Sequence, residues 1–85
     1  MPDIKKLFED ASIAAKSLKK RPSDDDLLAL YALYKQATAG DVAGERPGFF
    51  DFVGAAKHDA WAALKGLSTA EAMQKYIAKV NALKS

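Results

Sequence analysis

The spacing of the apolar residues constrains this chain most, because they recur at intervals of three and four in nearly every segment. That spacing places them on one face of an α-helix, whereas a half-buried strand alternates at every second residue. Proline and glycine interrupt the pattern at Pro22, between Gly40 and Gly48, and at Gly66. The spacing therefore predicts four helices and no strand.

The first predicted helix runs from about Asp3, its N-cap, to Leu18. Basic residues at 16–21 crowd its last turn and the positions just beyond, where the helix dipole favours cations, and Pro22 ends the segment. The inner face of this helix holds seven apolar residues: Ile4, Leu7, Phe8, Ala11, Ala14, Ala15 and Leu18.

The second predicted helix has a clear start at Ser23, a good N-cap followed by three aspartates that suit the positive end of the helix dipole. It continues from Leu27 to about Thr38 and stops at Gly40. Between Leu27 and Tyr34 it is apolar nearly all round, so it should be packed on more than one side, by other helices or by a ligand.

The rest of the chain predicts a long loop and two further helices. Residues 40–48 show no periodicity and form the longest loop. A third helix lies between Asp51 and Leu64, and a capping box of Ser68 and Glu71 opens a fourth that ends near Leu83. The fold class is all-α, a four-helix bundle in a single domain over residues 1–85. The expected inner faces are Phe52, Ala56, Ala60, Trp61 and Leu64 on the third helix, and Met73, Tyr76, Ile77, Val80 and Leu83 on the fourth.

The composition of the chain excludes several classes of function. The 85 residues contain no cysteine, which removes thiol nucleophiles and Cys-based metal sites and is compatible with a reducing cytosol. A net charge of +2 is too small for a committed nucleic-acid binder. No apolar run reaches the roughly 20 residues that cross a bilayer, and we see no secretory signal. We expect a cytoplasmic protein without a transmembrane segment.

The sequence offers no credible catalytic or metal-binding set. His58 is the only histidine, and the bland interpretation is a surface or rim side chain. Asp24, Asp25 and Asp26 are consecutive, so on a helix they point about 100° apart and cannot converge on one ion. We therefore expect neither an enzyme nor a metal site nor a resident cofactor.

One stripe of the second helix combines different chemistries. Tyr31 and Lys35 are one helical turn apart, with Leu27 and Leu28 on the preceding turn. The same pattern would also be found in a core helix that ends with a solvated lysine and binds no ligand. If Lys57 and other cations gather here, however, the pocket would suit a ligand with phosphates, an aromatic base and a long apolar tail.

The central run from Tyr31 to Asp41 resembles the signature of acyl-CoA-binding proteins, and the match spans essentially the whole chain. It continues through Glu45-Arg46-Pro47-Gly48, Lys57, Asp59-Ala60-Trp61, Leu64-Lys65-Gly66, Ser68, Ala72-Met73 and Tyr76-Ile77. The resemblance implies helices in up-down-down-up order with a long connection between the second and third. It also implies binding of medium- and long-chain acyl-CoA esters by an intracellular carrier and pool former that catalyses no reaction.

The resemblance also assigns roles to residues. Tyr31, Lys35 and Lys57 match the positions around the adenine and the ribose 3′-phosphate, and Tyr76 matches a head-group contact. Lys16 matches a basic contact on the first helix, and Leu27 and Leu28 match the acyl groove. The candidate ligand-binding residues are Lys16, Leu27, Leu28, Tyr31, Ala32, Leu33, Tyr34, Lys35, Lys57 and Tyr76.

The chain also departs from the family pattern. Val53 and Ala55 stand where lysine is common, which predicts a thinner basic rim, and His58 replaces a usual tryptophan. Phe49 and Phe50 replace an aliphatic pair.

Two rival functions belong to other classes. A DNA-binding module would need a polar recognition helix, whereas the second helix is leucine and tyrosine. A protein-interaction module would use the Leu27–Tyr34 stripe as an exposed patch. We expect a monomer whose partners are acyl-CoA esters and the enzymes that use them, with no nucleic acid.

Overall fold

The computed structural model describes residues 3–84, which form four helices and no strand. The helices are α1 (Ile4–Ala15), α2 (Asp24–Ala39), α3 (Phe52–Ala62) and α4 (Thr69–Leu83). The predicted all-α class is confirmed. The ends of the expected domain, residues 1 and 85, lie outside the described residues.

Each helix begins where a short polar side chain accepts a hydrogen bond from the first turn, which satisfies one of the otherwise orphaned backbone N–H groups. Asp3, Ser23 and Ser68 are the N-caps of α1, α2 and α4, as predicted, and Asp51 caps α3 by accepting from the Gly54 amide at 2.9 Å. In the predicted capping box the Ser68 hydroxyl also donates to the Glu71 carboxylate at 3.0 Å.

The first helix ends earlier than the sequence indicates. α1 stops at Ala15 rather than Leu18, because the amides of Lys16 and Ser17 bond three residues back instead of four and tighten the chain into a turn. The basic residues 16–21 therefore lie beyond the helix and not in its last turn. α3 lies within the predicted range between Asp51 and Leu64.

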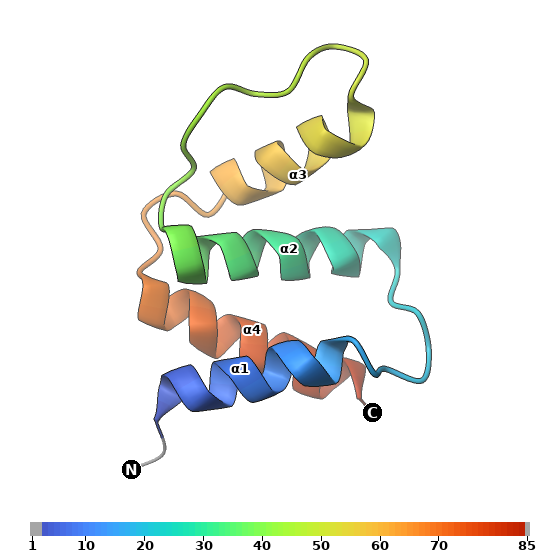
Figure 1. Ribbon diagram of the computed structural model, residues 1–85, viewed down its shortest axis with the longest axis vertical. Helices are drawn as coiled ribbons and strands as arrows, with labels where there is room; N and C mark the ends of the chain where they lie inside the picture. Colours follow the sequence, from blue (N-terminus) through green and yellow to red (C-terminus); the bar gives the residue numbers. More distant parts are fainter. Residues whose placement is uncertain (1–2, 85) are drawn as a thin grey trace.

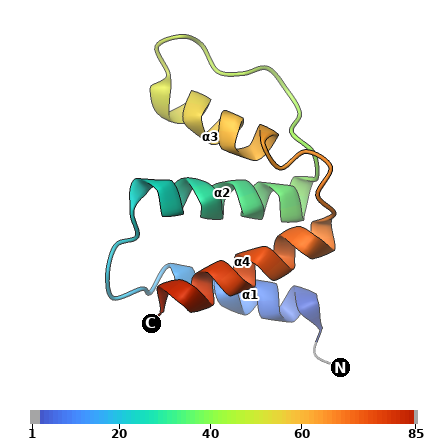
Figure 2. The same ribbon diagram turned by 180° about the vertical axis from the view of Figure 1, so that it is seen from behind.

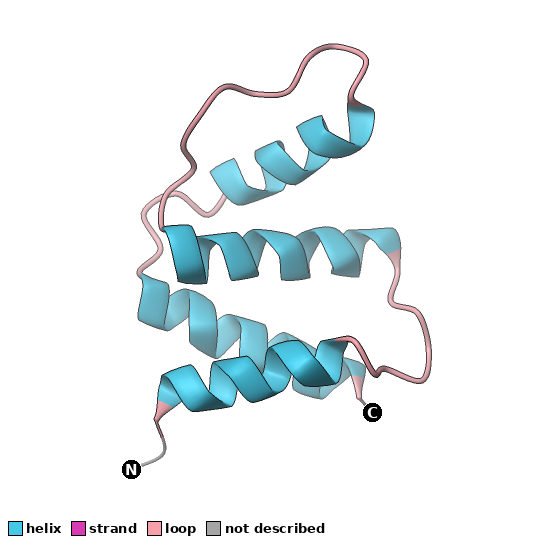
Figure 3. Cartoon of the chain, in the orientation of Figure 1, coloured by secondary structure: helices cyan, strands magenta, loops and turns pink. Residues whose placement is uncertain are grey.

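The helices follow the predicted up-down-down-up order. α1 and α4 run one way, and α2 and α3 run the other way (Figure 1). Because α2 and α3 are parallel, the chain must return along the length of α2 before α3 starts. Residues 40–51 make that return as a long loop, visible outside the helices in Figure 3.

The helices pack in a stack rather than as a closed square. α3 contacts α2, α2 contacts α4, and α4 contacts α1 (Figures 1 and 2). α2 is thus covered on two sides, as its apolar surface predicts. The buried core cluster comes from α1, α2 and α4 only, and its members are Phe8, Ala11, Leu30, Leu33, Ala37, Ala72, Tyr76 and Val80.

The predicted inner face of α3 is wrong at its first position. Phe52 is exposed, while Ala55 and Trp61 are buried. Among the helices, α3 packs on α2 alone and diverges from it toward the start of α3 (Figure 1), so no other helix covers Phe52 in the first turn. Since Ala55 is buried, only Val53 of the two expected rim positions lies on the surface.

Candidate functional site

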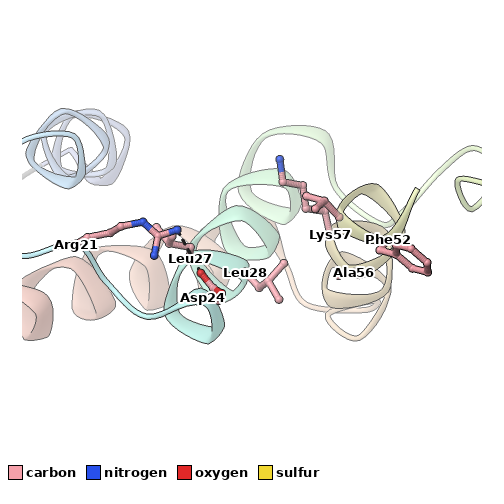
Figure 4. Close-up of a pocket in the computed structure, with 8 residues that line it drawn as sticks. Arg21, Asp24, Leu27, Leu28, Phe52, Ala56 and Lys57 are labelled. Carbon is pink, nitrogen blue, oxygen red and sulfur yellow. Dashed lines mark hydrogen bonds and ion pairs between the residues drawn. The ribbon is translucent and has the colours of Figure 1, made fainter. Parts of the chain in front are cut away.

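Two hollows lie on either side of Leu27. The first, which we call the α2–α3 groove, has a volume of about 440 Å³ (Figure 4). The second, the tyrosine groove, has a volume of about 400 Å³ and lies among α1, α2 and α4. Leu27 lines both, so they are adjacent on the surface of α2. The α2–α3 groove is lined by Arg21, Asp24, Leu27, Leu28, Phe52, Val53, Ala56 and Lys57, and the tyrosine groove by Ser12, Ala15, Lys16, Leu27, Leu30, Tyr31, Tyr34 and Tyr76.

The walls of the α2–α3 groove are largely apolar. Leu28 extends from α2 toward α3, and Phe52 stands at the opposite end of the lining from Arg21 (Figure 4). Arg21 forms an ion pair with Asp24 at 3.2 Å at one margin. The groove can therefore accept a hydrocarbon chain along its length while charged groups remain at the edge.

Three tyrosines make the lining of the tyrosine groove largely aromatic. Tyr76 is buried, and its ring lies 5.0 Å from Phe8 and 6.1 Å from Tyr34. Burial, and to a smaller extent the neighbouring Tyr34, raise the pKa of the Tyr76 hydroxyl above its ordinary value of 10.0. The hydroxyl therefore stays protonated at neutral pH and remains a hydrogen-bond donor.

Two cation–π contacts join α2 and α3, and each helix supplies one lysine and one aromatic ring. The Lys57 ammonium lies 5.2 Å from the ring centre of Tyr31, and that of Lys35 lies 4.9 Å from the Trp61 ring. Lys57 lines the α2–α3 groove, whereas Tyr31 lines the tyrosine groove. A cation thus stands where the apolar groove meets the aromatic one.

The structure brings together most of the residues predicted for the site. Lys35 lies on α2 but lines neither groove and contacts Trp61 instead. Ala32 and Leu33 are 2% and 9% exposed and line another hollow between α2 and the end of α3. The seven predicted residues that line the two grooves are Lys16, Leu27, Leu28, Tyr31, Tyr34, Lys57 and Tyr76.

Several groove residues were not predicted from the sequence. Phe52 was assigned to the core, and Val53, Ala56, Arg21 and Asp24 were not named as site residues, yet all five line the α2–α3 groove. The available signal was the adjacent pair Phe52 and Val53, because consecutive helical positions point about 100° apart and one covered face cannot bury both.

His58 lies away from both grooves. It is half-buried, and its Nε2 lies 3.4 Å from the Gly44 carbonyl of the long loop. His58 is therefore a rim side chain, within the surface or rim interpretation drawn from the sequence, and it contacts the long loop. Within residues 3–84 no three His, Asp or Glu side chains are grouped to hold a metal ion. Over the same residues, no helix has both the length and the apolar character that crossing a membrane requires.

A stack of helices with an apolar groove, an adjoining aromatic groove and a cation between them defines a small helical ligand-binding protein. A family model described as "Acyl CoA binding protein" matches residues 5–80. The chain belongs to the acyl-CoA-binding protein family.

Relatives agree in sequence and in fold. The chain is 51% identical to the acyl-CoA-binding protein of Brassica napus over 94% of this chain and 87% of that one. It is 49% identical to acyl-CoA-binding protein homolog 1 of Caenorhabditis elegans, over 89% and 88%. The crystal structure of Oryza sativa acyl-CoA-binding protein 2 superposes with a TM-score of 0.91 at 46% identity, covering 95% of this chain and 90% of that one.

Proposed function

We propose that this protein binds one medium- or long-chain acyl-CoA ester and serves as an intracellular carrier and pool former for it. The observation that carries the proposal is the position of Lys57, over Tyr31 and beside the apolar α2–α3 groove. A single ligand with an apolar tail and an anionic, aromatic head would occupy both grooves at once.

The tail would supply much of the affinity. Each buried methylene contributes about 0.8 kcal/mol, so a long chain in the α2–α3 groove would bring several kcal/mol before binding costs are subtracted. Leu27, Leu28 and Ala56 would cover it from the two helices. Chains longer than the groove would protrude into water and gain nothing further.

The head group would lie over the tyrosine groove. Tyr31 offers an aromatic face to the adenine, and the protonated Tyr76 hydroxyl is a donor for a phosphate oxygen. Lys16, Lys35 and Lys57 supply positive charge without requiring the planar two-point geometry of arginine. These residue roles follow the family resemblance; the groove linings support those of Lys16, Lys57, Tyr31 and Tyr76, whereas that of Lys35 rests on the resemblance alone.

The role is binding, not turnover. The family consists of acyl-CoA-binding proteins, and we expect no reaction at either groove. We further propose that the protein acts as a monomer in the cytoplasm and exchanges its ligand with enzymes that use acyl-CoA. The rival protein-interaction function is not favoured, because Leu30, Ala32 and Leu33 of the Leu27–Tyr34 stripe are buried.

Calorimetry with palmitoyl-CoA, free CoA and palmitate tests this function. We expect a 1:1 complex with palmitoyl-CoA and much weaker binding of either half, since each half fills only one groove. Equal affinity for all three ligands, or no binding at all, would overturn the proposal.

A further inference from the structure

A further apolar hollow lies next to the α2–α3 groove, between α2 and the end of α3. We call it the distal hollow, and its volume is about 380 Å³. Three leucines, four alanines and one carboxylate line it: Leu28, Leu33, Leu64, Ala29, Ala32, Ala60, Ala63 and Asp25. The only charged group among these eight residues is the Asp25 carboxylate, which repels an anion. The distal hollow therefore suits a neutral hydrocarbon and not a phosphate or a carboxylate.

Leu28 is the one residue that the linings of the α2–α3 groove and the distal hollow have in common. On α2 the groove is lined by positions 24, 27 and 28, and the distal hollow by positions 25, 28, 29, 32 and 33. Successive helical positions point about 100° apart, so the two sets face different sides of α2 and meet at Leu28. The Leu28 side chain is half-buried and extends from α2 toward α3 (Figure 4). It therefore stands between the two hollows.

α3 presents a continuous wall of small side chains to both hollows. Ala56 lines the α2–α3 groove, and Ala60 and Ala63 line the distal hollow. Spacings of four and three residues place these three alanines on one face of the helix, along about 10 Å of its length. Since methyl side chains leave space between the helices, the obstacle between the two hollows is the Leu28 side chain of α2.

The hollows follow one another in a fixed order. Leu27 lines both the tyrosine groove and the α2–α3 groove, and Leu28 lines both the α2–α3 groove and the distal hollow. An apolar tail whose head group lies over the tyrosine groove would pass Leu27 first and reach Leu28 afterwards. Leu28 thus stands where the tail would end.

We propose that the Leu28 side chain closes the α2–α3 groove on the side away from the tyrosine groove and so sets the longest acyl chain that the protein covers. This inference rests on the proposed acyl-CoA binding. A tail that reaches Leu28 meets a branched side chain, and its further carbons turn outward into water. With a smaller side chain at this position the two hollows would join, and the tail would continue along Ala60 and Ala63.

Calorimetry with palmitoyl-CoA, arachidoyl-CoA and lignoceroyl-CoA tests the proposal, at ligand concentrations below those at which the esters form micelles. Each tail in this series is four methylenes longer than the one before. The readout is the affinity for lignoceroyl-CoA divided by that for palmitoyl-CoA, which cancels any loss that is common to both ligands. We expect a ratio near one for the wild type. Each methylene that enters the distal hollow improves affinity by up to about four-fold, so Leu28→Ala should raise the ratio at least about ten-fold.

Leu27→Ala is the matched control. It removes the same atoms from the neighbouring residue, which is also half-buried and lines the α2–α3 groove but not the distal hollow. It should weaken the binding of every ester and leave the ratio unchanged. Leu28→Val, a milder truncation, should raise the ratio by less than Leu28→Ala does. It keeps the test available if the alanine variant proves unstable by circular dichroism.

A second substitution tests whether the distal hollow receives the tail. Ala63 is exposed at the C-cap of α3, so a larger side chain fits there without overpacking the core. Ala63→Leu would fill the distal hollow. Combined with Leu28→Ala, it should return the ratio to the wild-type value.

Four results would overturn the role of Leu28. The first is a wild type whose affinity keeps rising through lignoceroyl-CoA, and the second is an equal ratio in the Leu28→Ala and Leu27→Ala variants. The third is a double variant that keeps the raised ratio, and the fourth is a Leu28→Ala variant that binds two ligand molecules. In each case tight 1:1 binding of palmitoyl-CoA by the wild type leaves the proposed function standing, whereas no binding of any ester by the wild type refutes both proposals.

Discussion

On one side of α2 lie α1 and α4, which pack through buried apolar side chains. On the other side, α3 packs on α2 and in addition forms directional contacts with residues 40–51. Trp61 Nε1 donates to the Gly40 carbonyl at 2.8 Å, and Arg46 bonds both oxygens of Asp59 at 2.9 and 3.0 Å. No buried α3 side chain joins the core cluster. Apolar burial tolerates small shifts, whereas hydrogen bonds weaken steeply as their geometry changes. The two sides should therefore respond differently to mutation, ligand and pH.

The largest expected difference concerns stability and two phenylalanines. Phe8→Ala should lower the free energy of unfolding by about 3–5 kcal/mol, because it leaves a cavity in the core beside Tyr34 and Tyr76. Phe50→Ala, at an exposed position near α3, should change it by less than about 0.5 kcal/mol. Urea denaturation followed by circular dichroism measures both, and similar losses would contradict the division into two sides.

The next effect concerns ligand affinity on the α3 side. Lys57→Ala and Lys35→Ala should each weaken palmitoyl-CoA binding by about 1.5–3 kcal/mol, the range for hydrogen bonds to charged groups. The loss should be far smaller for a ligand without the 3′-phosphate, when both are measured by calorimetry. Equal losses on the two ligands would mean that the lysines act through the packing of α3 on α2.

A smaller effect isolates one directional contact. Trp61→Phe keeps a large ring against α2 but removes the donor to the Gly40 carbonyl, at a cost of about 1 kcal/mol. Amide hydrogen exchange should become faster in α3 and in residues 40–51 before it changes in α1 and α4. Uniform acceleration over all four helices would show that α3 unfolds only together with the core.

The smallest effect is a pH dependence of the α3 side. The hydrogen bonds from Arg46 hold the pKa of Asp59 below its ordinary value of 3.8. A carboxylate with a lowered pKa in the folded state stabilises the protein above pH 3.8 and loses that contribution as the pH falls through the folded-state value. The stability gap between wild type and Asp59→Asn should therefore be present at neutral pH and close in acid. Both side chains are more than half exposed, so the gap is small. A gap of constant size across the titration would exclude this linkage.

Sequence patterns predicted the apolar side of the molecule better than the α3 side. The spacing of three and four identified Tyr76 and Val80 on α4, because burial there follows one helical face. On α3 the same spacing misplaced Phe52, since α3 is rich in apolar residues on several faces. Its orientation depends on contacts far apart in the sequence, such as those between Trp61 and Gly40.

The candidate site was predicted mainly through family resemblance. Periodicity placed Tyr31 and Lys35 on one face of α2, but no spacing rule brings Lys57 over Tyr31 from another helix. The groove itself depends on the divergence of α3 from α2, which only the three-dimensional arrangement reveals (Figure 1).

The stacked arrangement also has a kinetic consequence. The contact between α2 and α4 joins segments that are separated by the whole of α3, so forming it carries the entropic cost of closing that loop. Among the helices, α3 contacts only α2, so it can dock after the contact between α2 and α4 has formed. We therefore expect destabilising substitutions in α3 to raise the unfolding rate in a chevron plot and to leave the refolding rate nearly unchanged.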